Sequence, residues 1–161
     1  MQYITYIDSP AGELEIIGTD EAINAVNFVK STRQTASESL PAIFEECIAQ
    51  LNEYFEGKRR IFDFRIEQEG TDFQKRVWSE LLKIPFGKTI SYLELARRLG
   101  DEKVIRAAGS ANGKNQLGII VPCHRVIGAD GKLVGYAGGL DKKRWLLDHE
   151  DRLANGVLTL F

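Results

Sequence analysis

Cys123 stands in the pentapeptide PCHRV at residues 122–126, where the residue types favour nucleophilic chemistry. A thiolate attacks carbon readily, and cationic neighbours stabilise it, so His124 and Arg125 predict a reactive thiol. The proline restricts the backbone in front of the cysteine. A Gly-rich stretch, GADGKLVGYAGG, follows and could wall a pocket. These features fit an alkyl acceptor and a thiol hydrolase equally well.

The chain in front of the pentapeptide contains the elements that must position it. Ile119–Val121 is a short apolar run, expected to be a buried strand or extended segment. TDFQ at Thr71–Gln74 and SYLE at Ser91–Glu94 match capping boxes. The spacing predicts a helix after each box, the second ending at Leu99 before a glycine, and a third helix over Lys103–Ala111.

The second and third helices, joined by a short turn with glycine, match the helix-turn-helix pattern. Such pairs are often only packing units, so the pattern alone does not establish DNA binding. Small side chains line the third helix, namely Ala107, Ala108, Gly109, Ser110 and Ala111. Its backbone could therefore approach a nucleic-acid groove closely. Arg106 lies near its start, where the helix dipole also favours a phosphate.

The first seventy residues are expected to form a small α/β unit. Short strands are predicted at Tyr3–Ile7, Glu13–Gly18 and Ile23–Val29, with a further strand at Ile61–Ile66. LPAIFEECIAQLNEYFEG, at residues 40–57, has the apolar spacing of an amphipathic helix. The pattern changes near residue 70, which predicts two domains.

These two predicted domains, residues 1–70 and 71–161, carry opposite charge. The first has 6 Lys and Arg against 13 Asp and Glu, a net charge of −7. The second has 15 against 10, a net charge of +5. A basic domain is compatible with a polyanion such as DNA, but charge alone fits two solvated faces of opposite sign equally well.

Several classes of protein and site are not expected. No apolar run approaches the ~20 residues of a membrane helix, and the N-terminal residues lack the features of a signal peptide. We therefore expect a cytoplasmic protein without a membrane partner. Cys47 lies on the apolar stripe of its helix and is predicted to be a core thiol, not paired with Cys123. The two cysteines and two histidines lack zinc-ligand spacing, so no metal is expected.

VPCHRVIG, together with the segments around it, resembles the O6-alkylguanine-DNA alkyltransferases, also called methylated-DNA–protein-cysteine methyltransferases. The matching segments are FQKRVWSELLKIPFGKTISYLELA, RAAGSANGKN and GYAGGLDKKRWLLDHE, which cover nearly all of residues 71–161 at unbroken spacing. Residues 1–70 match loosely, in size and α/β character. The resemblance implies an α+β fold, with a small RNase-H-like α/β N-terminal domain and a mainly helical, winged helix-turn-helix C-terminal domain.

The resemblance also implies the roles of the reacting groups. Cys123 would be the nucleophile, and His124, acting through a water, would take its thiol proton. Glu150 would orient His124, as the acid does in a Cys–His–acid relay. Asn115 would hold the turn before the cysteine. Arg125 is expected to be structural, pairing with nearby carboxylates or carbonyls.

Contacts to DNA are implied in the same way. Tyr92 would donate a proton to the departing guanine and press on the target phosphate, so that the nucleotide rotates out. Arg106 would enter the base stack and fill the gap. Ala107, Gly109 and Ser110 would lie against the minor groove.

The pocket implied for the flipped base is formed by the Gly-rich stretch. Tyr136, Gly138 and Gly139 would line it, and the backbone carbonyl of Val126 would accept from the guanine amine. This sequence departs from the family in two respects: it lacks the cysteines and histidines of the zinc site that some members have, and a glycine and Lys114 stand where some members carry a second arginine.

The activity implied is irreversible, single-turnover transfer of an alkyl group from O6-alkylguanine in double-stranded DNA to Cys123, by a monomer without a cofactor. O4-alkylthymine is a further substrate that the resemblance allows. Three alternatives differ from it: a lesion-binding relative that lacks the cysteine, a helix-turn-helix regulator with a sensor cysteine, and a thiol hydrolase using Cys123, His124 and Glu150.

Overall fold

The computed structural model describes residues 1–30 and 34–156 of the chain. It contains two compact units. The first comprises Met1–Gln68 with Gln116–Ile120, and the second comprises Glu69–Asn115 with Val121–Phe161. Within the described ranges, no helix combines the length and the apolar character that crossing a membrane requires.

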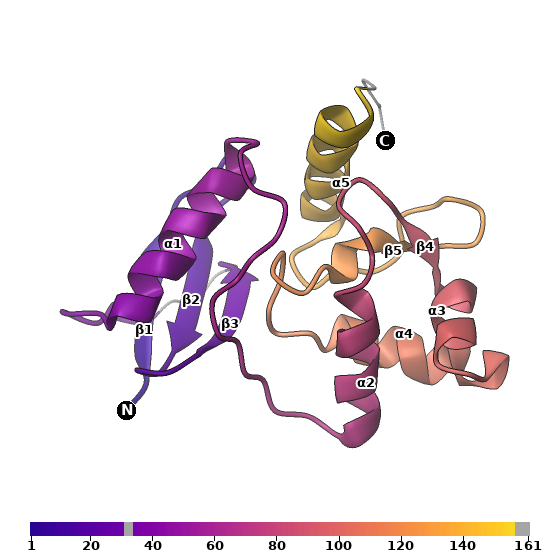
Figure 1. Cartoon of the computed structure of the whole chain (residues 1–161), viewed down its shortest axis with the longest axis horizontal. Coiled ribbons are helices and arrows are strands. Elements are labelled where there is room, and N and C mark those ends of the chain that lie inside the picture. Colours follow the sequence, from indigo (N-terminus) through magenta and orange to yellow (C-terminus); the bar gives the residue numbers. More distant parts are fainter. Residues whose placement is uncertain (31–33, 157–161) are drawn as a thin grey trace. The chain divides into compact units, whose positions relative to one another are not determined.

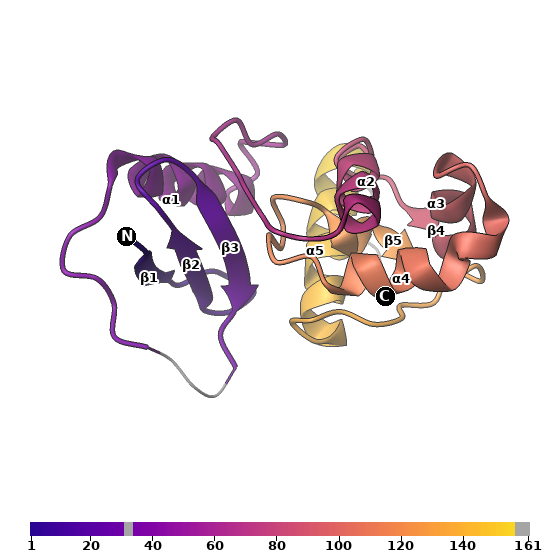
Figure 2. The ribbon, with the colours of Figure 1, turned by 90° about the horizontal axis from the view of Figure 1, so that it is seen from below.

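A three-stranded antiparallel sheet and one helix form the first unit. The strands β1 (Tyr3–Ile7), β2 (Leu14–Gly18) and β3 (Ile23–Phe28) lie in the order β1-β2-β3. The helix α1 (Ala42–Phe55) lies against one face of this sheet (Figures 1 and 2). The three predicted strands and the amphipathic helix are therefore confirmed.

The buried side of α1 follows the predicted apolar spacing. Phe44, Cys47, Leu51 and Tyr54 have no exposed surface. Burial raises the pKa of the Cys47 thiol to about 12, so this thiol stays protonated and unreactive at neutral pH. The prediction of a core cysteine is confirmed.

The predicted strand at Ile61–Ile66 is wrong. Ile66 forms only an isolated bridge with Ile23. The Ile23 amide donates to the Arg65 carbonyl at 3.0 Å, and the Glu67 amide donates to the Ile23 carbonyl at 3.0 Å. The apolar residues of this segment meet the edge of β3 at one point and do not continue alongside it.

A second segment reaches β3 from much later in the chain. The Val26 amide donates to the Gln116 carbonyl and the Gly118 amide to the Val26 carbonyl, both at 2.9 Å. The chain then turns instead of continuing as the extended segment predicted at Ile119–Val121: Ile119 has a φ of 71°, in the left-handed region, and the Ile120 amide donates to the Gly118 carbonyl at 2.8 Å. Residues 119–121 are buried as predicted, but they are buried in a turn and do not form a strand.

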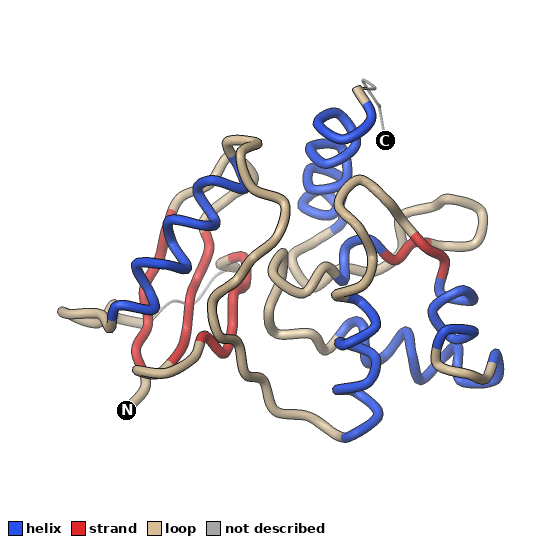
Figure 3. The backbone as a smooth tube through the Cα atoms, viewed as in Figure 1, coloured by secondary structure: helices blue, strands red, loops and turns tan. Residues whose placement is uncertain are grey.

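The second unit is mainly helical (Figure 3). Its elements are α2 (Asp72–Leu81), β4 (Ile90–Ser91), α3 (Tyr92–Arg98), the 3₁₀ helix η1 (Glu102–Val104), α4 (Ile105–Gly113), the 3₁₀ helix η2 (Cys123–Arg125), β5 (Val126–Ile127) and α5 (Leu140–Asn155). The predicted fold class, a small α/β unit followed by a mainly helical one, is confirmed.

The starts of α2 and α3 follow the predicted capping residues. Thr71 and Gln74 form the complete reciprocal capping box that TDFQ predicts. The second box is only half made: the Ser91 hydroxyl accepts from the Glu94 amide at 3.0 Å, but the Glu94 carboxylate pairs with Arg98 at 3.1 Å. The predicted third helix is likewise divided, into η1 and α4.

Two side chains hold the helices of this unit together. The Trp78 indole Nε1 on α2 donates to the Ala111 carbonyl of α4 at 2.9 Å. Arg76 Nη2 on the same helix donates to the Leu99 carbonyl at the end of α3, at 2.9 Å. The helix-turn-helix is thereby fixed on α2 through main-chain acceptors.

A short parallel pairing brings the cysteine close to the start of α3. Ile90 and Ser91 pair with Val126 and Ile127, respectively. Tyr92 directly follows the first strand, and η2 directly precedes the second, so the pairing brings these two segments together. The last helix, α5, also contacts η2.

Candidate active site

Cys123 begins the single turn of η2, which follows the tight turn around Ile119. The Asn115 amide Nδ2 donates to the Val121 carbonyl at 2.8 Å, and the Cys123 amide donates to the same carbonyl at 2.8 Å. Asn115 is 5% exposed, so its hydrogen bond is shielded from water. Asn115 thus ties the end of α4 to the turn before the cysteine.

The Cys123 thiol is buried, and burial raises its pKa. A hydrogen bond with Asn115 and the charge of Lys143 lower the pKa, but they do not reverse the effect of burial. Burial thus opposes the thiolate that His124 and Arg125 were expected to favour. At rest the group is a thiol, and a base must remove its proton.

His124 and Glu150 form the central pair of the site. His124 Nε2 lies 2.7 Å from Glu150 Oε2, and the two side chains are 0% and 1% exposed. Glu150 lies on the buried side of α5, seven residues after Lys143, with Leu146 and Leu147 between them on the same side. The pair therefore joins η2 to α5.

Arg125 binds the same carboxylate. Its Nε donates to Glu150 Oε1 at 2.7 Å and its Nη2 donates to Glu150 Oε2 at 3.0 Å, while Nη1 donates to the Ile84 carbonyl at 2.7 Å. The guanidinium is thus occupied by structural partners, and the predicted structural role of Arg125 is confirmed. Its charge is directed at Glu150 and not at the cysteine.

The charges in this cluster follow from its geometry. Burial alone would raise the pKa of Glu150, but His124 and Arg125 lower it well below its usual range. Burial lowers the pKa of His124, against the opposite effect of Glu150. At neutral pH Glu150 is therefore ionised and His124 is neutral.

The proton on His124 can be assigned from this charge state. An ionised carboxylate only accepts hydrogen bonds, so His124 Nε2 carries the proton and donates to Glu150. Nδ1 is then left with a free lone pair, and it has no hydrogen-bond partner in the described part of the chain. This arrangement presents a buried base next to the cysteine.

Tyr92 opens α3 and faces the cysteine region. Its hydroxyl donates to the Val134 carbonyl at 3.0 Å. Burial and the nearby Cys123 raise its pKa, although a hydrogen bond with Asn112 acts the other way. The phenol is therefore protonated at neutral pH and holds a proton that it can donate.

Lys143 is a buried cation that the sequence analysis did not single out. Its Nζ donates to the carbonyls of Val126 at 2.7 Å, Val134 at 2.9 Å and Gly135 at 3.2 Å. It is 0% exposed. The Val126 carbonyl that the resemblance assigns to a guanine amine thus already accepts one hydrogen bond.

The segment Gly128–Gly139, called the pocket loop after the role that the resemblance implies for it, connects β5 to α5. Tyr136 lies in it, and burial, followed by Cys123 and Glu150, raises its pKa well above the usual value. Gly139 has a φ of 103°, and its carbonyl accepts from the amides of Lys142 and Lys143. Gly138, like Tyr136 and Gly139, is partly exposed. The loop therefore places Tyr136 near the reacting groups.

The small residues of α4 lie on two sides of the helix, one exposed and one buried. Arg106, Ala107 and Ser110 are exposed, whereas Ala108 and Ala111 are buried. Gly109 lies beneath Tyr92, since a Cβ built there would meet the ring at 3.6 Å. Only part of the predicted DNA-facing set is thus exposed, and Gly109 instead borders the tyrosine.

Comparison with known proteins places this site in a family. Residues 72–152 match the model for the DNA-binding domain of 6-O-methylguanine DNA methyltransferase. Residues 2–68 match the model for its ribonuclease-like domain. The chain belongs to the 6-O-methylguanine DNA methyltransferase family.

Individual relatives agree with this membership over almost the whole chain. A methylated-DNA–protein-cysteine methyltransferase of Mycobacterium bovis is 46% identical over 158 residues, 96% of each chain. The crystal structure of the O6-methylguanine methyltransferase of Mycobacterium tuberculosis is 44% identical, with a TM-score of 0.86 over 96% of this chain and 95% of that one. A structure of OGT from the same organism in complex with DNA is 46% identical, with a TM-score of 0.84 over 92% of each.

Two buried polar residues of this methyltransferase were missed by sequence reasoning. Asn112 is 5% exposed, and its Nδ2 donates to the Cys123 carbonyl at 3.3 Å. Lys143 could have been found from the helical spacing, because it lies on one stripe with Leu146, Leu147 and Glu150. A lysine on a buried stripe is unusual enough to mark a site.

Glu150→Gln is expected to lower the free energy of unfolding by about 3 kcal/mol, because it leaves the buried Arg125 guanidinium without a counter-charge. Chemical denaturation, followed by tryptophan fluorescence, measures this loss. The control is Glu80→Gln, which breaks a partly exposed pair with Lys83 and should cost less than about 1 kcal/mol. Equal losses in the two variants would contradict a structural role for the buried cluster.

Proposed function

We propose that this chain repairs alkylated DNA directly, by transferring the alkyl group from O6 of guanine to the sulfur of Cys123. It acts as a methylated-DNA–protein-cysteine methyltransferase that is consumed by one turnover. The observation that carries the proposal is the neutral His124, which directly follows the buried Cys123 in the chain, binds ionised Glu150 through Nε2 and has no hydrogen-bond partner at Nδ1. Family membership and the overall similarity to methyltransferases agree with it.

The first step in this proposal is removal of the thiol proton. His124 Nδ1 accepts the proton of Cys123 through a water, and the imidazolium that forms is stabilised by its hydrogen bond to Glu150. Because burial raises the pKa of Cys123, the thiolate forms only when a base takes its proton. Asn115 holds the backbone that presents the sulfur.

The second step is displacement at the alkyl carbon. A bond forms between Cys123 Sγ and that carbon, the bond from the carbon to O6 breaks, and its electron pair stays with guanine. Tyr92 donates a proton to the departing base, and the proton that His124 took from the thiol returns through water to the Tyr92 phenolate, so that both side chains end neutral. A thioether has no good leaving group, which makes the transfer irreversible, and the protein itself is the acceptor, so no cofactor takes part.

The reacting base must leave the duplex before it can reach Cys123. Extruding a nucleotide costs a few kcal/mol, and the lesion weakens its pairing. We assign Arg106 to the vacated space in the stack, with Ala107 and Ser110, the other exposed residues of α4, against the minor groove. The net charge of +5 on residues 71–161 favours the phosphate backbone.

The extruded guanine would occupy the pocket loop region. Tyr136, Gly138 and Gly139 would line it, and the Val126 carbonyl would accept from the guanine amine. In this proposal the protein acts as a monomer. Residues 71–161 contact the DNA and carry out the reaction, and residues 1–70 form a separate domain. Because the reaction needs a reduced thiol, the cytoplasm is the compartment that suits it.

Intact-protein mass spectrometry tests the proposed function. Incubation with duplex DNA that carries one O6-methylguanine should add one methyl group to each protein molecule, located on Cys123 by peptide mapping. Cys47→Ala should react like the wild type, because the Cys47 thiol is buried and protonated. Cys123→Ala should gain nothing.

Other outcomes would favour the alternatives. Unchanged protein mass with unrepaired DNA would sink the proposal and favour a regulator or a thiol hydrolase. A regulator would bind one DNA sequence tightly, and a hydrolase would turn over an ester or peptide repeatedly. DNA carrying O4-methylthymine in the same assay shows whether that base is a second substrate.

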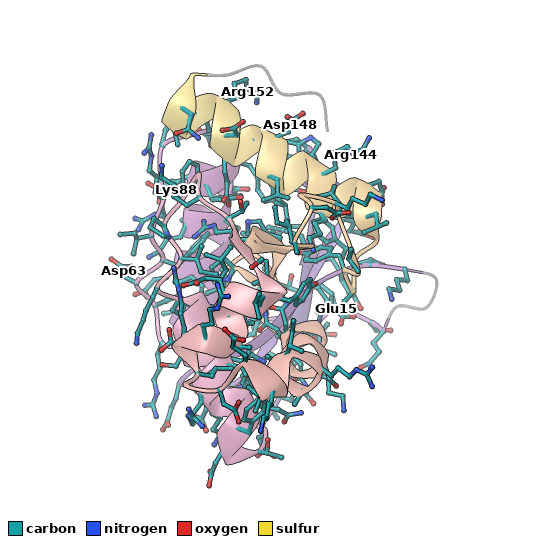
Figure 4. The ribbon with its side chains drawn as sticks, turned by 90° about the vertical axis from the view of Figure 1, so that its right-hand side faces the viewer. Glu15, Asp63, Lys88, Arg144, Asp148 and Arg152 are labelled. Carbon is teal, nitrogen blue, oxygen red and sulfur yellow. The ribbon has the colours of Figure 1, made fainter. Side chains whose placement is uncertain are left out.

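Arg106→Ala should slow repair of duplex DNA by about 100-fold, because the variant loses the side chain that offsets a few kcal/mol of unstacking. Its reaction with free O6-benzylguanine, which needs no extrusion, should be unchanged. The matched control is Arg152→Ala, which removes an exposed arginine from the outer side of α5, where Arg144, Asp148 and Arg152 lie in one row (Figure 4). Equal losses of Arg106→Ala on both substrates would exclude a role in filling the stack.

A further inference from the structure

The Asn112 side chain is a buried amide that makes only part of its hydrogen bonds. It is 5% exposed, and its Nδ2 donates to the Cys123 carbonyl at 3.3 Å. This contact fixes the orientation of the amide, because an oxygen in the place of Nδ2 would face another acceptor. The Asn112 Oδ1 has no hydrogen-bond partner within residues 1–30 and 34–156. A buried acceptor without a donor is costly, so it indicates a place where a donor binds.

Asn112 lies next to two groups of the proposed reaction. It follows Gly109 by three residues on α4, so the two residues share one side of the helix. A Cβ at Gly109 would meet the Tyr92 ring at 3.6 Å, which places this side of α4 against the tyrosine. A hydrogen bond with Asn112, which lowers the pKa of Tyr92, agrees with this placement. The free Oδ1 is therefore close to Tyr92 and to the main chain of Cys123.

Other acceptors of this region are already occupied. The Cys123 carbonyl accepts from Asn112 and from the Val126 amide, which fills both of its lone pairs. The Val126 carbonyl accepts from Lys143, so it has room for at most one further hydrogen bond. The amine of guanine carries two N–H groups, and the proposed function gives one of them to Val126. The second N–H needs another acceptor.

We propose that Asn112 is a specificity-determining residue, whose Oδ1 accepts a hydrogen bond from the amine of the extruded guanine. This inference rests on the proposed function and deepens it, because it says how the site recognises the base. The amine lies beside N3, on the edge that guanine presents in the minor groove. The contact gives Oδ1 the donor that it lacks, while Nδ2 keeps its hydrogen bond to the Cys123 carbonyl.

The same acceptor distinguishes guanine from thymine. On this edge thymine presents only O2, which is itself an acceptor. With O4-alkylthymine in the site, the Asn112 Oδ1 would therefore face a second acceptor and stay unpaired. A site that leaves a buried polar group unpaired discriminates strongly against that substrate. Asn112 thus favours O6-alkylguanine over O4-alkylthymine.

Two DNA duplexes that differ by one amino group test this contact. One carries O6-methylguanine, and the other carries O6-methylhypoxanthine, which lacks the amine. The rate of methyl transfer to Cys123 is measured on each duplex for the wild type and for Asn112→Leu, which is similar in size but has no acceptor. The wild type should react faster with guanine, and the ratio of the two rates should be about tenfold lower in the variant. Differences in extrusion between the two bases cancel from this comparison.

Asn52→Leu is the matched control, because it makes the same change at an exposed position of α1, and its ratio should equal that of the wild type. An equal loss of rate on both duplexes in Asn112→Leu would overturn the proposal and leave Asn112 with a structural role alone. If the wild type accepts no methyl group from O6-methylguanine, the proposed function fails instead.

A measurement without a change at position 112 covers the case in which Asn112→Leu does not fold. The unreactive variant Cys123→Ala is bound to each duplex in turn, and NMR follows the carbonyl carbon of the Asn112 side chain. A donor at Oδ1 should shift this signal in the complex with O6-methylguanine, relative to the complex with O6-methylhypoxanthine. Identical signals in the two complexes would contradict the contact.

Discussion

The Glu150 carboxylate is the one buried anion on which the arrangement of this site depends. It accepts from His124 on η2 and from Arg125 on the same turn, while Arg125 also donates to the Ile84 carbonyl. The cost of burying it is offset only because both oxygens are paired with donors. One side chain of α5 therefore fixes the orientation of the base, the position of η2 and, through η2, the position of the cysteine.

This constraint divides the charges of the site between structure and chemistry. Arg125 lies two residues after the cysteine but binds Glu150, and His124 is held neutral. Neither side chain therefore offsets burial, which raises the pKa of the Cys123 thiol. Lys143, the buried cation of α5, binds the carbonyls of Val126, Val134 and Gly135 and no carboxylate.

Local patterns predicted the elements but not how distant segments meet. The Thr71 box, the three strands and the stripe of α1 were all predictable, because each depends on neighbours along the chain. The predictions of a strand at Ile61–Ile66 and of an extended segment at Ile119–Val121 were wrong. An apolar run indicates that its residues are buried, but it does not show whether they pair with a neighbouring strand. The resemblance named His124 and Glu150, whereas Lys143 was missed because lysine is usually exposed. No local signal shows that Gln116 returns to β3.

Nitrogen NMR of the His124 ring tests most directly whether the site holds a neutral base. At pH 7 the ring should be neutral, with its proton on Nε2, and it should remain neutral as the pH falls through about 6.5, the ordinary histidine value. His124→Asn assigns the signals, since His149 is the other histidine of the chain. An imidazolium at pH 7, or a proton on Nδ1, would contradict the central claim that Glu150 prepares His124 to take the proton of Cys123.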